Sequence, residues 1–282
     1  MILVTGATGN VGGAVLEQLV QAGHEVRVLV RDPNKLGPVG EEVSVVKGDL
    51  AKPETLDAAF AGADKMFLVC TGGDLLTLAD NAVDAAKKAG VKHIVLLSSA
   101  SVIGEHETTI GRWHRELEAK IKASGIAWTM LQPGAFASNA LMWAHTLKAQ
   151  GAVFQPTGDG KTTPIDARDI AEVGVKALTS PGHEGKSYPL SGPEALSAAE
   201  QVAKISAALG RPLKFVDIPE AAAREQMERA GMPEVFIRAM SEVWSMIKSG
   251  HGTETTSMVE ALLGHKARTF DAWVANNVEA FK

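Results

Sequence analysis

Three glycines near the N-terminus have the spacing of a phosphate-binding loop. The segment VTGATGNVGG places Gly6, Gly9 and Gly12 between an apolar run and an amphipathic one. Glycines allow a sharp turn and a close approach of the backbone to a pyrophosphate, and the helix that follows offers N–H groups and partial positive charge. A purely structural turn is the alternative, but the strand–helix junction favours dinucleotide binding. The expected contact residues are Gly6, Thr8, Gly9, Asn10 and Val11.

The end of the second expected strand should select the cofactor. An NAD site has an acidic residue there for the ribose hydroxyls, whereas an NADP site has an arginine for the 2′-phosphate. The strand ends in VLVRDPNK, where Arg31 could bind a phosphate through two hydrogen bonds and Lys35 could add charge. Asp32 is the competing signal, but it precedes Pro33 and is better suited to start a turn or cap the next segment. We therefore expect NADPH, with NADH less favoured.

His114 and Glu118 lie one helical turn apart in RWHRELEAK. His114 could hydrogen-bond or protonate an oxyanion on a substrate, oriented by Glu118. The alternative is a helix-surface contact worth about 0.2–0.5 kcal/mol. Leu117 and Ile121 mark the buried face of this helix, and His114 borders that face. His114 is thus a candidate for lining a substrate site and for proton transfer.

Loops at the carboxyl ends of other strands should complete the cofactor cleft. GDL after the third strand could bring Asp49 and Leu50 to the adenine, and CTGG after the fourth could pass Cys70 and Thr71 beneath the adenosine. Cys70 is expected to be a small buried residue and not a nucleophile. Ser98 ends the fifth strand, where it either contacts the cofactor or only satisfies the backbone.

Composition limits the classes of function. The 282 residues are 45% hydrophobic with a net charge of −5 and no block of basic residues, which argues against nucleic-acid and membrane surfaces. The single cysteine excludes an internal disulfide and suits a reducing compartment. The opening MILVTG is too short and uncharged for a signal peptide, and no metal-ligand spacing is present. We expect a cytoplasmic protein without a metal.

Short apolar runs alternate with amphipathic ones over the first half of the chain. The expected strands are 2–6, 25–30, 43–49, 65–70, 93–99 and 127–133, and the expected helices are 11–23, 53–62, 75–90 and 111–125. Strands that are apolar throughout indicate a doubly wound, parallel α/β sheet covered on both faces. Strand–helix pairs follow at 162–178 and 187–210, and the remainder is expected to be helical. We expect a Rossmann-like domain over 1–150 and a smaller, mostly helical lobe over 151–282, with segments crossing back to the sheet.

These segments resemble the NmrA-like group of atypical short-chain dehydrogenases/reductases. That group includes NAD(P)H-dependent quinone, azo-dye and triphenylmethane-dye reductases and redox-sensing proteins that bind the cofactor. The resemblance covers almost the whole chain, through VTGATGNVGG, VRVLVRDPNK, VLLSSAS, HRELEAKIKASGIAWTMLQPGAFASN, PIDARDIAEV and YPLSGPEALSAAEQVAKISAALG. It implies a Rossmann-like domain with a small C-terminal lobe and a substrate held between them.

Typical short-chain reductases carry Tyr-x-x-x-Lys on the helix after the fifth strand. Here His114 and Glu118 have that spacing, and the one tyrosine, Tyr188, lies far along the chain. This weakens an epimerase or alcohol dehydrogenase, which must manage an alkoxide proton. NmrA-like reductases often have histidine at this position, and their quinone or cationic dye acceptors need less from the protein because the cofactor supplies the hydride.

The segment LQPGAFASNALMWAH follows the sixth strand. By resemblance and location, Pro133 and Phe136 should border the nicotinamide. Phe136 should also contact the substrate, together with Asn139 and Trp143 on the next helix. A flat aromatic acceptor would suit the two aromatic side chains. Core packing of Phe136 and Trp143 is an equal alternative.

Two functions remain open, and both need the glycine loop and Arg31. The first is an NADPH-dependent reductase that transfers hydride to a small aromatic or quinone-like acceptor. The second is a non-catalytic NADP(H)-binding redox sensor. The apolar segment PGAFASNALMW and the long C-terminal lobe favour the enzyme. A homodimer and a monomer are both possible.

Overall fold

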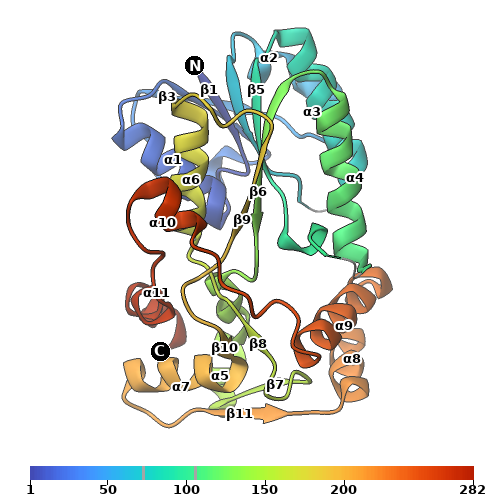
Figure 1. Cartoon of the computed structure of the whole chain (residues 1–282), viewed down its shortest axis with the longest axis vertical. Helices are drawn as coiled ribbons and strands as arrows, with labels where there is room; N and C mark the ends of the chain where they lie inside the picture. The colour runs from blue at the N-terminus through green and yellow to red at the C-terminus, as the bar shows by residue number, and fades with distance from the viewer. Residues whose placement is uncertain (72–73, 105–106) are drawn as a thin grey trace. The chain divides into compact units, whose positions relative to one another are not determined.

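The computed structural model describes residues 1–71, 74–104 and 107–282 (Figure 1). The chain forms two compact units. Unit 1 consists of Met1–Gly104, Gly111–Pro133 and Ala167–Pro189, and unit 2 consists of Gly134–Asp166, Leu190–Lys282 and the described part of Glu105–Ile110. The sequence-based division placed its boundary at residue 150 and foresaw segments crossing back. In the structure the chain leaves unit 1 after Pro133, and 167–189 belongs to unit 1.

Unit 1 is built on a seven-stranded sheet with the order β3-β2-β1-β4-β5-β6-β9. The strands are β1 (Ile2–Thr5), β2 (Val26–Val30), β3 (Val43–Lys47), β4 (Lys65–Leu68), β5 (His93–Leu97), β6 (Ala127–Pro133) and β9 (Lys186–Leu190). All five neighbouring pairs from β3 to β6 are parallel. This is the order of a Rossmann-like, doubly wound sheet, so the expected fold class is confirmed. The strand order reverses between β1 and β4, where such sheets bind their ligands.

Helices cover both faces of this sheet. They are α1 (Asn10–Gln21), α2 (Asp57–Phe60), α3 (Leu75–Ala89), α4 (Thr109–Ala123) and α6 (Ala167–Thr179). Figure 1 shows α1 and α6 on one side and α3 and α4 on the other. On the α3–α4 side, Ile94 and Leu96 of β5 pack in one apolar cluster with Leu78 of α3 and Leu117 of α4. In the central strands β1, β4 and β5 successive residues are buried, which agrees with the mainly apolar runs in the sequence.

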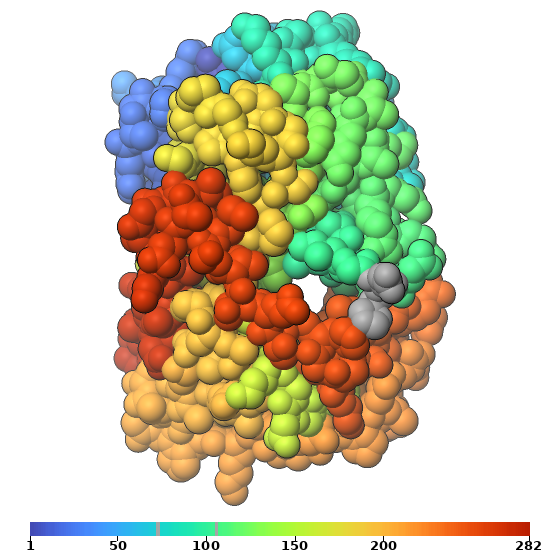
Figure 2. All heavy atoms as spheres, in the orientation of Figure 1, coloured from blue at the N-terminus to red at the C-terminus, as the bar shows by residue number. Residues whose placement is uncertain are grey.

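A glycine lets α6 lie close to the sheet on the other side. A Cβ at Gly174 would meet the Phe67 ring at 3.0 Å and Leu131 at 3.3 Å. The helix also receives a hydrogen bond from α1, because Gln18 Nε2 donates to the Arg168 carbonyl at 3.2 Å. The outer side of α6, coloured yellow, forms part of the molecular surface in Figure 2.

Unit 2 combines helices with short strand pairs. Its elements are η4 (Ala137–Trp143), α5 (Ala144–Gln150), β7 (Ala152–Gln155), β8 (Lys161–Thr162), β10 (Leu196–Ser197), α7 (Ala198–Leu209), β11 (Lys214–Asp217), α8 (Glu220–Arg229), α9 (Glu234–Lys248), α10 (Met258–Leu263), α11 (Phe270–Asn277) and η5 (Val278–Phe281). We predicted that the chain beyond residue 210 is helical with short breaks and did not predict β11, which pairs in parallel with β7. Four residues are too few to show a strand period, so only the pairing reveals β11.

Aromatic side chains from the C-terminus close the core of unit 2. The Phe270 and Trp273 rings stack with centroids 5.4 Å apart, and Phe281 meets Trp273 edge-on at 6.2 Å. Arg211 Nη2 donates to the Phe281 carbonyl at 3.1 Å and so fixes the end of the chain. Among the described residues, no helix has both the length and the apolar content needed to cross a bilayer.

Candidate cofactor-binding site

Two glycines of the loop between β1 and α1 stand where a side chain would not fit. Gly6 has φ +68°, and a Cβ there would lie 2.9 Å from Val69 Cβ. A Cβ at Gly12 would lie 2.3 Å from the Gly6 carbonyl oxygen, so α1 can start against β1 only with glycine at this position. Thr5, which sequence reasoning missed, ties the loop to the next strand, because its buried Oγ1 accepts from Val69 N at 2.8 Å. A rigid, close-packed strand–helix junction results.

The start of α1 is suited to an anion. Gly9 is the N-cap and offers no side-chain oxygen to the first-turn N–H groups, and the first turn holds no acidic residue. The helix end therefore keeps its partial positive charge for a ligand. Thr8, Gly9 and Asn10 are exposed at this point, whereas Val11 is buried against the sheet. The loop thus fits the pyrophosphate of a dinucleotide.

The end of β2 presents a basic residue while its acidic neighbour is engaged. Asp32 Oδ1 accepts from Asn34 N and from Asn34 Nδ2, both at 3.1 Å, and it caps the short 3-10 helix η1 (Pro33–Lys35). The cap expected for Asp32 is confirmed. Arg31 and Lys35 are exposed. A carboxylate that caps a turn is less available to ribose hydroxyls, so the local structure favours the basic residues as ligands.

The described residues of the next two loops include one exposed and two buried members of the predicted set. Asp49 Oδ1 accepts from Ala51 N at 3.0 Å, and Leu50 is buried with its carbonyl bound by Asn81 Nδ2 at 2.8 Å. Cys70 is 6% exposed, and burial raises the pKa of its thiol to about 12, which agrees with a packing role. Thr71 is exposed, and the glycines that follow it, residues 72–73, lie outside the described residues.

Polar side chains gather where β5 and β6 end. Ser98 Oγ donates to Glu118 Oε1 at 2.7 Å, and Gln132 Nε2 donates to the same oxygen at 2.8 Å. Lys122 Nζ lies 3.1 Å from Glu118 Oε2. Among the described residues these three hold Glu118, where the sequence spacing had suggested His114. Sequence reasoning did not single out Gln132.

His114 lies on α4 and is half-buried, at the border position that the helical pattern predicted. The residue already takes part in an interaction within the protein. Pro133 is the buried last residue of β6. The remaining predicted residues, Phe136, Asn139 and Trp143, belong to unit 2.

In unit 2, Phe136 is half-buried and pairs by a single bridge with Ile165. Asn139 and Trp143 lie on η4, and Asn139 is exposed. Trp143 is 9% exposed and packs in an apolar cluster that includes Leu147. Of the two alternatives for Trp143, the structure favours core packing, and we do not retain it as a substrate residue.

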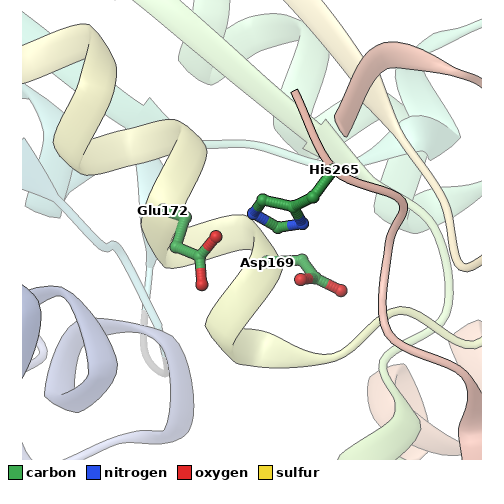
Figure 3. A group of neighbouring side chains, drawn as sticks. All are labelled: Asp169, Glu172 and His265. Atoms are coloured by element: carbon green, nitrogen blue, oxygen red, sulfur yellow. The ribbon is translucent and has the colours of Figure 1, made fainter. Parts of the chain in front are cut away.

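Two carboxylates on α6 were not predicted from the sequence. Figure 3 shows Asp169 and Glu172 projecting from this helix. Asp169 is fully buried and Glu172 half-buried, and each has polar partners. We assign no metal to these residues.

Comparison with known proteins identifies the family. A family model described as NAD(P)H-binding matches residues 6–181. The chain is 40% identical to the NAD(P)H azoreductase of Xenophilus azovorans over 283 residues, which covers 100% of this chain and 99% of that protein. It belongs to the NAD(P)H-binding, NmrA-like family of atypical short-chain dehydrogenases/reductases.

Two further relatives support this assignment. The chain is 40% identical to the (4-alkanoyl-5-oxo-2,5-dihydrofuran-3-yl)methyl phosphate reductase of Streptomyces griseus subsp. griseus, with 100% of this chain and 99% of that protein covered. The structure of the NADPH-dependent quinone oxidoreductase of Escherichia coli in complex with NADPH has a TM-score of 0.84, 26% identity and 99% coverage of both chains. Homologues of this NmrA-like protein are therefore NAD(P)H-dependent oxidoreductases.

The only tyrosine of this NmrA-like protein does not stand on α4. Tyr188 is buried on β9, and its hydroxyl lies 2.7 Å from His183 Nδ1. The helix position of the usual tyrosine carries His114, and the position of the usual lysine carries the buried Glu118.

Proposed function

We propose that this protein is an NADPH-dependent reductase that transfers hydride to a quinone or a similarly conjugated acceptor. The observation that carries the cofactor choice is the Asp32 cap, because it engages the one carboxylate at the end of β2 and leaves Arg31 exposed beside it. The guanidinium can then form two hydrogen bonds with a 2′-phosphate. Lys35 adds a second positive charge on the same turn.

The names of the relatives support the proposed acceptor class. They are reductases of azo compounds, of an oxo-dihydrofuran phosphate and of quinones. All of these carry a conjugated, electron-poor double bond that can accept a hydride. NADPH supplies that hydride, and the protein binds and orients the two partners. His114 is the group that we propose to hydrogen-bond the oxyanion of a reduced quinone.

Arg31→Ala tests the cofactor choice. Loss of a charge-assisted hydrogen bond should cost about 1.5–3 kcal/mol, which raises the Kd for NADPH roughly 10- to 150-fold. The Kd for NADH should not change, because NADH has no 2′-phosphate. The matched control is Arg229→Ala, which removes an arginine from an exposed ion pair with Glu225 in unit 2. Equal NADPH affinity in Arg31→Ala and wild type would remove Arg31 as the selector.

Turnover separates the enzyme from a sensor. NADPH oxidation is followed by absorbance with a panel of quinones and azo dyes, with NADH in parallel. Turnover with one acceptor class, faster with NADPH, supports the reductase. Tight NADPH binding without turnover on any acceptor supports the redox sensor, which needs the same loop and Arg31. A cytoplasmic location belongs to the same proposal, and cell fractionation checks it. The proposal allows a homodimer or a monomer, and light scattering distinguishes the two.

A further inference from the structure

Three buried polar side chains meet at the carboxyl ends of β5 and β6. Ser98, Glu118 and Gln132 are 4%, 5% and 6% exposed. The register of the two strands explains the meeting, because Leu97 of β5 lies beside Leu131 of β6. The next residue on each strand is then Ser98 and Gln132, and both direct a donor to Glu118 Oε1. One carboxylate oxygen thus holds two strand ends together.

This arrangement fixes the orientation of both donors. The Gln132 Nε2 group donates to the carboxylate, so the amide oxygen must point away from Glu118. The Ser98 hydroxyl proton is also committed to Glu118, which leaves its lone pairs as acceptors. Within the described residues the Gln132 side chain makes no second hydrogen bond. The strand ends therefore offer acceptor oxygens at positions that Glu118 determines.

The second carboxylate oxygen is occupied separately. Lys122 Nζ lies 3.1 Å from Glu118 Oε2 and 5.0 Å from the centre of the Trp128 ring. This ion pair balances the buried charge without competing for Oε1. The charge of Glu118 is thus compensated on one side, and its hydrogen-bonding capacity is used on the other.

The position in the sheet indicates the ligand. In this strand order a dinucleotide lies across the switch point between β1 and β4. With the pyrophosphate at the glycine loop and the 2′-phosphate at Arg31 beside β2, the other half of the dinucleotide extends toward β4, β5 and β6. That half carries the nicotinamide, whose carboxamide has an NH₂ donor and needs an acceptor oxygen.

We propose that Glu118 is a positioning residue that holds Ser98 and Gln132 so that their oxygens accept the nicotinamide carboxamide N–H groups. The inference rests on the proposed NADPH-dependent function and extends it to the orientation of the ring. In typical short-chain reductases, a lysine at the position of Glu118 lowers the pKa of a tyrosine. In the proposed site, the Glu118 carboxylate orients two neutral acceptors instead. The residue type at this position therefore differs from that of typical short-chain reductases, and so does the role that we propose for it.

The experiment compares two ligands that differ only in the nicotinamide. Wild type, Glu118→Gln and Gln132→Met are titrated by calorimetry with NADP⁺ and with 2′-phospho-ADP-ribose, which lacks the ring. The glutamine side chain at position 118 would turn an NH₂ toward Lys122 or toward the two donors, so the network cannot stay intact. Both variants should bind NADP⁺ about tenfold more weakly, the scale of one hydrogen bond, and bind 2′-phospho-ADP-ribose as wild type does.

Glu116→Gln is the matched control, because it removes the same charge from an exposed position of α4. It should leave both affinities unchanged. Equal losses for the two ligands, or no loss for either, would overturn the positioning role. If Glu118→Gln does not fold, Gln132→Met and Ser98→Ala carry the same expectation. Failure of the wild type to bind either ligand would instead overturn the proposed function, and this inference with it.

Discussion

Gly12→Ala should damage both the packing of unit 1 and its cofactor loop. A Cβ at position 12 lies 2.3 Å from the Gly6 carbonyl oxygen, 2.6 Å from its carbon and 3.0 Å from the Thr5 oxygen. All three are backbone atoms, so no side-chain rotation relieves the clash. Ordinary contact begins near 3.4 Å, so the start of α1 must move away from β1 by about 1 Å.

The size of the effect follows from two opposing contributions. Overpacking costs about 1–3 kcal/mol, and alanine regains about 1 kcal/mol of helix propensity relative to glycine. The net loss of about 0–2 kcal/mol should lower Tm by up to roughly 8 °C for a chain of this size. The displaced loop should also lose at least one charge-assisted hydrogen bond to the pyrophosphate. The Kd for NADPH should therefore rise roughly 10- to 150-fold.

Gly13→Ala is the internal control, one residue further along the same helix. Its Cβ would lie 3.2 Å from the Ala7 carbonyl oxygen, so a small adjustment accommodates it. Its Tm should stay the same or rise by a few degrees. Thermal unfolding measures the Tm, and a titration followed by cofactor fluorescence measures the Kd for NADPH. If Gly12→Ala has the Tm and NADPH affinity of Gly13→Ala, close packing is not the reason for glycine at position 12.

Two other predictions concern histidines. His93 and His183 are 2% and 7% exposed, and burial lowers the pKa of both imidazoles. Folding therefore favours their neutral forms, and this contribution to the free energy of unfolding is fully present above the unfolded pKa near 6.5. It is lost as the pH falls from there toward the lower pKa values of the folded protein. The free energy of unfolding should fall by up to about 1.4 kcal/mol per pH unit and histidine in this window. The free energies of unfolding from urea titrations should therefore depend less steeply on pH in His93→Gln than in wild type, and an unchanged pH dependence would contradict this expectation. For His114→Ala, kcat with quinones should fall by about tenfold or more while turnover of a cationic dye, which leaves no oxyanion, is unchanged. Unchanged quinone turnover would remove His114 from the mechanism.

Local signals in the sequence were sufficient to predict the first six strands and the part of the candidate site at the glycine loop and at the end of β2. The Asp32 cap spans two residues and depends only on the Pro33 turn, so residue types were enough to predict it. The glycine loop was equally predictable, because glycines with this spacing occur at a strand–helix junction. The first six strands were found because each is a short, mainly apolar run that is separated from the next by an amphipathic segment, and their ends differ from the expected ones by only a few residues.

Features that depend on long-range pairing were out of reach. The strand β11 contains four residues and exists because β7 lies beside it, some sixty positions earlier in the chain. Trp143 could not be assigned from its type, since an aromatic residue suits a core and a binding surface equally. Only its neighbours in the apolar cluster of unit 2 decide for the core.

Glu118 shows how a correct helical pattern can lead to a wrong partner. On an isolated helix the residue one turn away is the natural contact, and that contact is His114. In the folded protein Ser98 and Gln132 come from strands 20 and 14 residues away, and both place buried donors within reach of the carboxylate. A buried donor without an acceptor costs about 1–3 kcal/mol, several times the value of an exposed helical pair. The larger cost of leaving the buried donors unsatisfied therefore determines the partners of Glu118. Its carboxylate binds the ends of β5 and β6, where the proposed nicotinamide site lies.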